Sequence, residues 1–190
     1  MEAINGVQVR LAPSYMTEPS QAIFRIYRDT RFSADKRPYK TRLGAWFGRA
    51  GIPRKSAAGF YFHLSSKDFL VAGGCYQPPP EQLRAIQQHL LAHNKRFRQS
   101  TATAPIPQLV GSEGESLSRE PKGFPKDHPA GDLIRHQPWG WHASLPLALA
   151  QSPGLVPEIS SCFETLAPVV ELFNEPFLRP ADSTRGIFFD

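Results

Sequence analysis

The sequence predicts an α+β fold, in which one antiparallel sheet is built around a central hairpin and helices pack mainly on one face of that sheet. Two runs rich in aromatic and β-prone residues, 58–65 and 68–76, are separated by a short polar turn, which is typical of a hairpin. Two longer segments, 80–99 and 152–174, repeat apolar residues at helical spacing. The hairpin pattern and the two helical segments together define the fold class.

Composition places the chain among ordinary globular proteins. It has 190 residues, of which 41% are hydrophobic and 21% are charged, so we expect a single domain over 1–190. Residues 1–20 form a short N-terminal segment and residues 178–190 a C-terminal tail. No apolar run is long enough to span a membrane and no signal peptide is visible, which predicts a cytoplasmic protein with no membrane partner. Two cysteines, Cys75 and Cys162, provide neither a disulfide framework nor metal-ligand spacing.

In the hairpin, alternation predicts Phe60, Phe62 and Leu64 on one face of the sheet and Tyr61 and His63 on the other. The Gly73-Gly74 pair indicates a bulge or a close approach by another backbone or a ligand.

The remaining elements are expected in the following order. An edge strand covers 4–11, a helix 21–29, and a strand or short helix 43–47. Short paired strands lie near 109–110 and 115–117, a short helix covers 128–136, and a strand covers 138–146 with Trp139 and Trp141 on one face. Prolines 157 and 168 are expected to kink or interrupt the last helix.

The basic segment, residues 25–42, is the most distinctive polar feature. Seven of its eighteen residues are Lys or Arg, against two carboxylates. On a helix, Arg25, Arg28 and Asp29 share one face, which allows an Arg25–Asp29 ion pair. Clustered guanidiniums bind phosphate or carboxylate in bidentate fashion. The candidate ligand-binding residues here are Arg25, Arg28, Asp29, Arg31, Lys36, Tyr39 and Lys40.

The basicity of the chain is local. The net charge is +5, but residues 1–55 carry +7 and residues 56–190 carry −2. A local excess of cations favours a binding face over general attraction to polyanions.

A second polar block, residues 121–129, adds Lys122, Asp127 and His128 to the candidate site. Asp127 alternatively caps the helix that starts near His128. Because an Arg/Lys cluster needs counter-charge, we expect this loop to lie beside the basic segment, with the Gly73-Gly74 strand as the floor of a shared site.

The basic segment matches the pattern RxxRDxRFxxDKxPYKT, and two later blocks read FYFHLSSKDFLVAGGCYQPPPEQLRAI and REPKGFPKDHPAGDLIR. These blocks resemble an uncharacterised conserved bacterial protein family, a domain of unknown function, over about residues 25–177. The resemblance implies a mixed α and β fold and no established activity. The family's longer helical N-terminal segment is replaced here by about twenty residues that contain prolines.

Ordinary nucleotide, dinucleotide, serine-hydrolase and zinc-ribbon motifs are absent from the sequence. The first hypothesis is a pocket for an anionic small molecule, a phosphate or carboxylate, with no cofactor and no metal; His89 and His93, four apart, are taken as a solvated helix face. The second is nucleic-acid binding by the same basic face, and the third is an internal ion-pair network without a ligand. The sequence identifies no reaction; His63, Asp127 and His128 are the nearest proton-transfer candidates.

Overall fold

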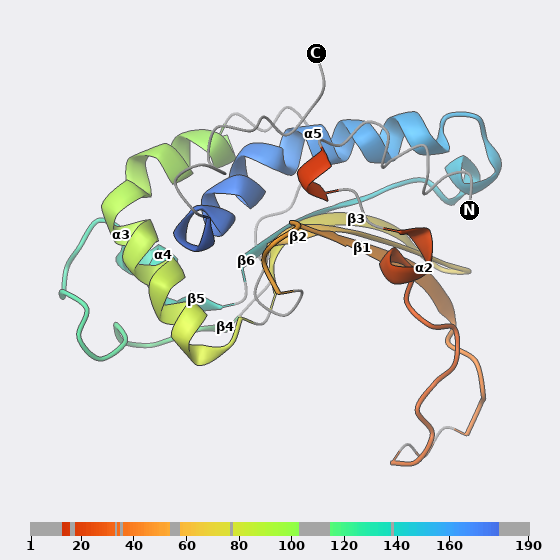
Figure 1. The fold of residues 1–190 in the computed structure, drawn as a ribbon, viewed down its shortest axis with the longest axis horizontal. Helices are drawn as coiled ribbons and strands as arrows, with labels where there is room; N and C mark the ends of the chain where they lie inside the picture. Colours follow the sequence, from red (N-terminus) through yellow and green to blue (C-terminus); the bar gives the residue numbers. More distant parts are fainter. Residues whose placement is uncertain are drawn as a thin grey trace.

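The computed structural model describes residues 13–15, 18–32, 34, 36–53, 58–76, 78–102, 115–137 and 139–178. Its centre is a four-stranded antiparallel sheet in the order β1-β2-β3-β6. The strands are β1 (Arg42–Gly48), β2 (Gly59–Ser65), β3 (Phe69–Cys75) and β6 (Trp139–Ser144). Figure 1 shows helices on one face of this sheet, so the predicted α+β class is confirmed.

The predicted hairpin is β2 and β3. Their register pairs Phe62 with Val71 and Phe60 with Gly73. Phe60 and Phe62 are buried in the core, whereas Tyr61 and His63 point to the opposite face, as the alternation predicts. β1 then adds to the outer edge of β2, and the segment expected as strand or helix over 43–47 is therefore a strand.

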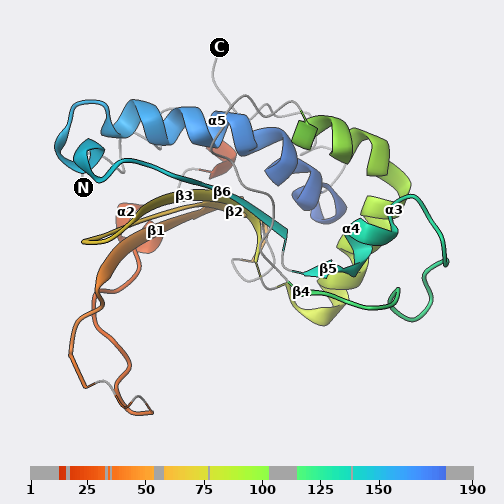
Figure 2. The ribbon, with the colours of Figure 1, turned by 180° about the vertical axis from the view of Figure 1, so that it is seen from behind.

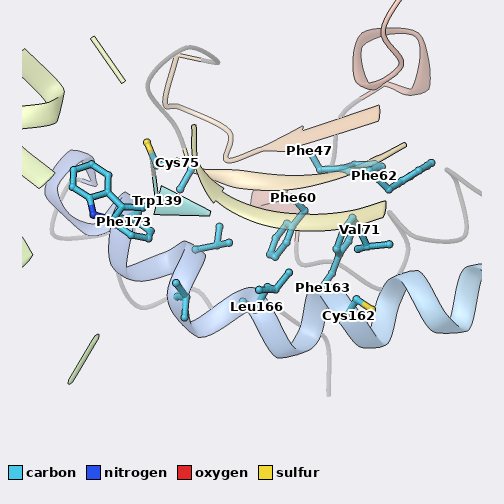
Figure 3. Packing of buried hydrophobic residues seen from close by; sticks show 14 of the residues in the cluster. Phe47, Phe60, Phe62, Val71, Cys75, Trp139, Cys162, Phe163, Leu166 and Phe173 are labelled. Atoms are coloured by element: carbon cyan, nitrogen blue, oxygen red, sulfur yellow. The ribbon is translucent and has the colours of Figure 1, made fainter. Parts of the chain in front are cut away.

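Helix α5 (Leu155–Asn174) runs along the face of the sheet that carries Phe60 and Phe62 (Figure 1; Figure 2). Phe163 packs on Phe60 with ring centroids 4.8 Å apart and on Phe47 at 5.7 Å, and Figure 3 shows these rings between helix and strands. Pro157 lies in the first turn, where its missing N–H has no cost. The helix continues through Pro168, so of the two predicted effects the interruption is wrong and the kink stays a prediction.

Gly73 and Gly74 are explained by close packing rather than by a ligand. A Cβ on Gly73 would lie 3.1 Å from side-chain atoms of Leu166 and Val170, so a bare backbone lets α5 sit directly on β3. Gly74 has φ +147° and a Cβ there would lie 2.2 Å from the Trp139 carbonyl oxygen. The predicted close approach by another backbone is thus found at Gly74.

One end of the domain is built on helix α3 (Pro80–Ala102), whose backbone departs from helical geometry at His93. Strands β4 (Glu115–Ser116) and β5 (His136–Gln137) pair with each other, and α4 (Gly131–Arg135) lies between them in the sequence. The short helix is thus smaller than the expected 128–136. The partner of β4 is β5; residues 109–110 lie outside the described residues. Trp139 and Trp141 share a face and both pack on Phe173, as expected.

The predicted helix over 21–29 is wrong. Helix α2 ends at Ala22 (Pro19–Ala22), and the chain then pairs with the segment that leads into β1. Bridges join Ile23 to Ala45 and Tyr27 to Tyr39. The Phe24 and Arg28 amides donate to the carbonyls of Gly44 and Pro38, at 2.9 Å each. The two bridges are four positions apart on one strand and six on the other, and such an insertion bends a ribbon.

Residues 23–42 therefore form a two-stranded projection, called the arm below. Figure 1 shows the arm in orange, extending away from the sheet. Alternating aromatic and β-branched residues such as Phe24 and Ile26 suit a paired strand, and the second strand supplies backbone partners that a helix would otherwise have provided.

A buried polar network ties the first and last described parts of the chain together. The 3₁₀ turn η1 (Pro13–Tyr15) places the Tyr15 hydroxyl against Glu171 of α5, and Arg49, at the end of β1, pairs with the same carboxylate. Asn174 donates to the Tyr15 oxygen at 3.1 Å and makes two hydrogen bonds with the backbone of Ala58. Burial, followed by the Glu171 charge, raises the pKa of Tyr15, so its hydroxyl remains a donor.

Two further 3₁₀ turns, η2 (Leu147–Gln151) and η3 (Glu175–Phe177), flank α5. The expected edge strand over 4–11 lies outside the described residues, as does the expected tail apart from Leu178.

Asn174→Leu should lower the free energy of unfolding by about 2–4 kcal/mol, because it leaves the Ala58 N–H and C=O buried and unpaired, at about 1–3 kcal/mol each. Urea denaturation measures the change. Gln88→Leu, on the exposed side of α3, is the control and should change stability by less than about 0.5 kcal/mol. Equal effects of the two substitutions would contradict the role of Asn174.

Gly73→Ala should destabilise the fold by about 1–3 kcal/mol, because the added methyl group overpacks the contact between α5 and β3. Gly140→Ala is the matched control in β6, where a Cβ would meet nothing within 4 Å. Thermal or urea unfolding should find the control unchanged or slightly stabilised. A Gly73→Ala variant as stable as the parent would show that α5 can move off β3 without cost.

Candidate functional site

The arm carries most of the residues that the sequence analysis selected. Arg25, Arg31, Lys36, Tyr39 and Lys40 are exposed on it. Each lies on an extended strand or near the tip. Extended strands present successive side chains to opposite sides, so the cations are distributed over the two faces and along the length of the arm.

The arm accounts for the net charge of the chain. Residues 25–42 contain seven of the 22 Lys and Arg residues and two of the 17 Asp and Glu residues. The remaining residues are then balanced at fifteen of each sign, and the arm has the whole excess of +5. The protein is electrostatically neutral except for this projection.

Aromatic side chains are interleaved with these cations. The Tyr27 and Tyr39 rings face each other across the arm with centroids 5.5 Å apart. On the opposite side, Lys40 Nζ lies 5.7 Å from the centre of the Phe24 ring. Phe32, near the tip, is 94% exposed and is contacted by the Arg31 guanidinium at 5.7 Å. A side chain this apolar and this exposed is available for contact with a partner.

Asp29 pairs with Arg31 rather than with Arg25. The Asp29 Oδ2 atom lies 2.7 Å from Arg31 Nη2, and the hydrogen bond from the Arg31 side chain holds the pKa of Asp29 below its ordinary value. Lys36 Nζ donates to the Thr30 carbonyl at 2.9 Å. Asp29 therefore orients an arginine near the tip, and the expected Arg25–Asp29 ion pair of a helical face is replaced by a contact within the extended chain.

The expectation of one site shared by the arm and residues 121–129 is wrong. Figures 1 and 2 place the arm at one end of the molecule and the loop before α4 at the other. That loop packs on α3: Arg84 covers the Phe124 ring at 5.4 Å and donates to the Lys122 carbonyl. Helix α4 begins after Ala130 without a side-chain cap, so the alternative role of Asp127 as its cap is wrong. His128 Nδ1 accepts a hydrogen bond from the Ala130 amide at 3.1 Å.

A chain of hydrogen bonds lies on the sheet at the base of the arm. His63 Nε2 is 2.9 Å from Asp68 Oδ2, and His63 Nδ1 is 3.1 Å from the Tyr61 hydroxyl. Hydrogen bonds from Ser65 and then His63 lower the pKa of Asp68, so its carboxylate accepts from Nε2 and leaves Nδ1 to accept from Tyr61. Burial raises the pKa of Tyr61. Of the three expected proton-transfer candidates, only His63 lies near the arm.

Sequence reasoning missed Tyr61, Asp68 and Arg42 as members of this neighbourhood. Arg42 pairs with Ser65 across β1 and β2, and the Phe24 ring lies 6.1 Å from that of Tyr61. The aromatic alternation of the hairpin located Tyr61, but nothing in the sequence indicates that the arm begins beside it.

Metal-binding geometry is not formed within the described part of the chain: no group of three or more His, Cys, Asp and Glu side chains is arranged to hold an ion there. His89 and His93 have ring centroids 4.4 Å apart, and His89 Nε2 lies 3.0 Å from Glu175. Burial raises the pKa of Cys75 to about 12 and that of Cys162 to about 11. None of the helices among the described residues has the length and apolar character needed to cross a membrane.

Comparison with curated proteins and with solved structures found no match. Comparison with family models found one, described as a conserved hypothetical protein (DUF2461), over residues 2–172. The matched region includes the arm, the sheet, loop 121–129 and the N-terminal residues that the sequence analysis set apart. The chain therefore belongs to the conserved hypothetical protein family DUF2461.

Proposed function

We propose that the protein binds nucleic acid through the arm. The observation that carries this proposal is the arrangement of the cations: they are exposed along a projecting ribbon, and they do not surround a common centre. A small phosphate or carboxylate is held by donors that converge on it. A polyanion is instead held by cations spread along its backbone.

The length of the arm suits such a partner. From Phe24 to Arg31 the strand spans seven steps of about 3.3 Å, or roughly 23 Å. Duplex DNA carries one phosphate charge for about every 1.7 Å of its axis, so an arm of this length meets several phosphates at once.

The aromatic residues support nucleic acid over other polyanions. Tyr27, Phe32 and Tyr39 are all exposed on the arm, at 57%, 94% and 55%. Base–aromatic stacking contributes about 1–3 kcal/mol per base, whereas a purely charged polymer offers no flat apolar surface to these rings. The exposure of Arg25, Arg31, Lys36 and Lys40 also disfavours an internal ion-pair network, whose cations would be buried.

Binding of a labelled oligonucleotide, followed by fluorescence anisotropy at several KCl concentrations, tests the proposal. The affinity should fall steeply with salt, with a slope of about −0.7 to −0.9 per phosphate contact. The variant Arg25→Gln/Lys36→Gln/Lys40→Gln should reduce the magnitude of this slope by about 2–3, since it removes three cations.

The matched control is Lys95→Gln/Lys122→Gln/Lys126→Gln. These lysines are also exposed, but they lie on α3 and loop 121–129, at the end of the molecule opposite the arm. Removing them lowers the net charge by the same amount, so the slope should remain nearly unchanged. Equal slopes for both triple variants would mean that net charge, and not the arm, attracts the oligonucleotide. No binding at low salt, with stabilisation by millimolar inorganic phosphate alone, would instead indicate a small-anion site.

A further inference from the structure

The sheet has a second face, on the side away from the long helix α5 (Figure 1; Figure 2), and at its outer edge the four-residue helix α2 contacts β1. Residues paired across neighbouring strands point to the same side of a sheet. On this face the register aligns Trp46 with Tyr61, Tyr61 with Ala72, and Ala72 with His142. Trp46 and Tyr61 therefore lie on adjacent strands, whose backbones are about 4.8 Å apart, and begin a row of positions that crosses all four strands.

The next row consists entirely of glycine: Gly48, Gly59, Gly74 and Gly140 are aligned across the four strands. No side chain projects from this row: a Cβ at Gly140 would meet nothing within 4 Å, whereas Gly59 and Gly74 are buried, the latter against the Trp139 carbonyl oxygen. The Trp46 indole lies over Gly59, where a Cβ would be 2.7 Å from Cζ2. Trp46 is half-buried, and its indole nitrogen has no exposed surface. Among the described residues its indole N–H meets no acceptor.

Tyr61 is held in a fixed orientation on this face. Its hydroxyl is bonded to His63, which is 5% exposed and is in turn bonded to Asp68. Gly44 leaves room for this arrangement, because a Cβ there would lie 3.3 Å from the Tyr61 hydroxyl oxygen. A preorganised aromatic ring loses little conformational entropy when a flat ligand stacks on it.

The face is continuous with the arm. Phe24, at the base of the arm, contacts the Tyr61 ring and carries Lys40 over its own ring. Arg42 belongs to the same face of β1 as Trp46 and lies four residues nearer the arm. The carboxylate described on this side, Asp68, is paired with His63. Lys40 and Arg42 therefore lie between the arm and the aromatic row, where they would contact the backbone of a polyanion bound to the arm.

We propose that this second face of the sheet binds unpaired bases, so that the preferred ligand is single-stranded nucleic acid, with its backbone on the arm and its bases on Trp46 and Tyr61. This inference rests on the proposed function. Bases in a duplex are stacked on one another and show only their edges in the grooves. Bases of a single strand expose flat faces that stack on aromatic side chains.

The experiment compares a 12-nucleotide single strand with the duplex of the same sequence, at one salt concentration. The native protein should bind the single strand at least about tenfold more tightly. Trp46→Leu/Tyr61→Leu should weaken single-strand binding about 10- to 100-fold and leave duplex binding unchanged. Trp46→Phe/Tyr61→Phe, which keeps two aromatic rings, should retain most of the affinity. The triple arm variant should weaken binding of both ligands.

Tryptophan fluorescence tests the same contact without relying on the leucine variant to fold. Single-strand binding should quench the emission of the native protein, and Trp46→Phe, which keeps Trp139 and Trp141, should lose that quenching. Equal or tighter binding of the duplex, unchanged quenching in Trp46→Phe, or equal losses for both ligands in a folded leucine variant would overturn this inference. Salt-dependent, arm-dependent binding would then still support the proposed function, whereas failure of both ligands to bind at low salt would remove both.

Discussion

The packing of α5 on one face of the sheet is the interaction on which the rest of the structure depends. Phe163, Leu166 and Val170 are all buried against the strands. This contact requires a bare backbone at Gly73, and it places Glu171 and Asn174 where they bind Tyr15, Arg49 and Ala58. A single long helix can cover only one side of four strands. Helix α5 therefore does not cover the opposite side of the sheet, and the arm leaves the domain next to that side.

The parts of the fold with a clear local pattern were predictable from the sequence. The alternation in 58–65 predicted the faces of β2 correctly, and helical spacing located α3 and α5 to within a few residues. The arm was not predictable in this way. Arg25, Arg28 and Asp29 have the spacing of one helical face, yet the same segment also alternates as a strand. Its partner strand, residues 38–45, decides between the two, and that pairing is not visible in local sequence.

The candidate site, like the fold, was predictable from the sequence only in part. Composition alone identified the basic residues, because a cluster of cations needs no knowledge of the fold. Their spatial arrangement depended on register and topology. Loop 121–129 was expected beside the arm on grounds of charge, but Arg84 and Arg98 bind its backbone carbonyls and hold it on α3. The row that joins Trp46, Tyr61 and His142 spans nearly a hundred residues of sequence, and only the pairing of four strands brings it together.

The confinement of the excess charge to the arm has a consequence for kinetics. A neutral body with five positive charges at one end has a large electric dipole. In the field of a polyanion such a molecule turns during diffusion, so most encounters begin with the arm already facing the partner. Orientation of this kind raises association rate constants by about 10- to 1,000-fold, and the gain declines as ionic strength rises. For the proposed nucleic-acid partner, the position of the charges would therefore govern how quickly a productive collision occurs, independently of how long the resulting complex lasts.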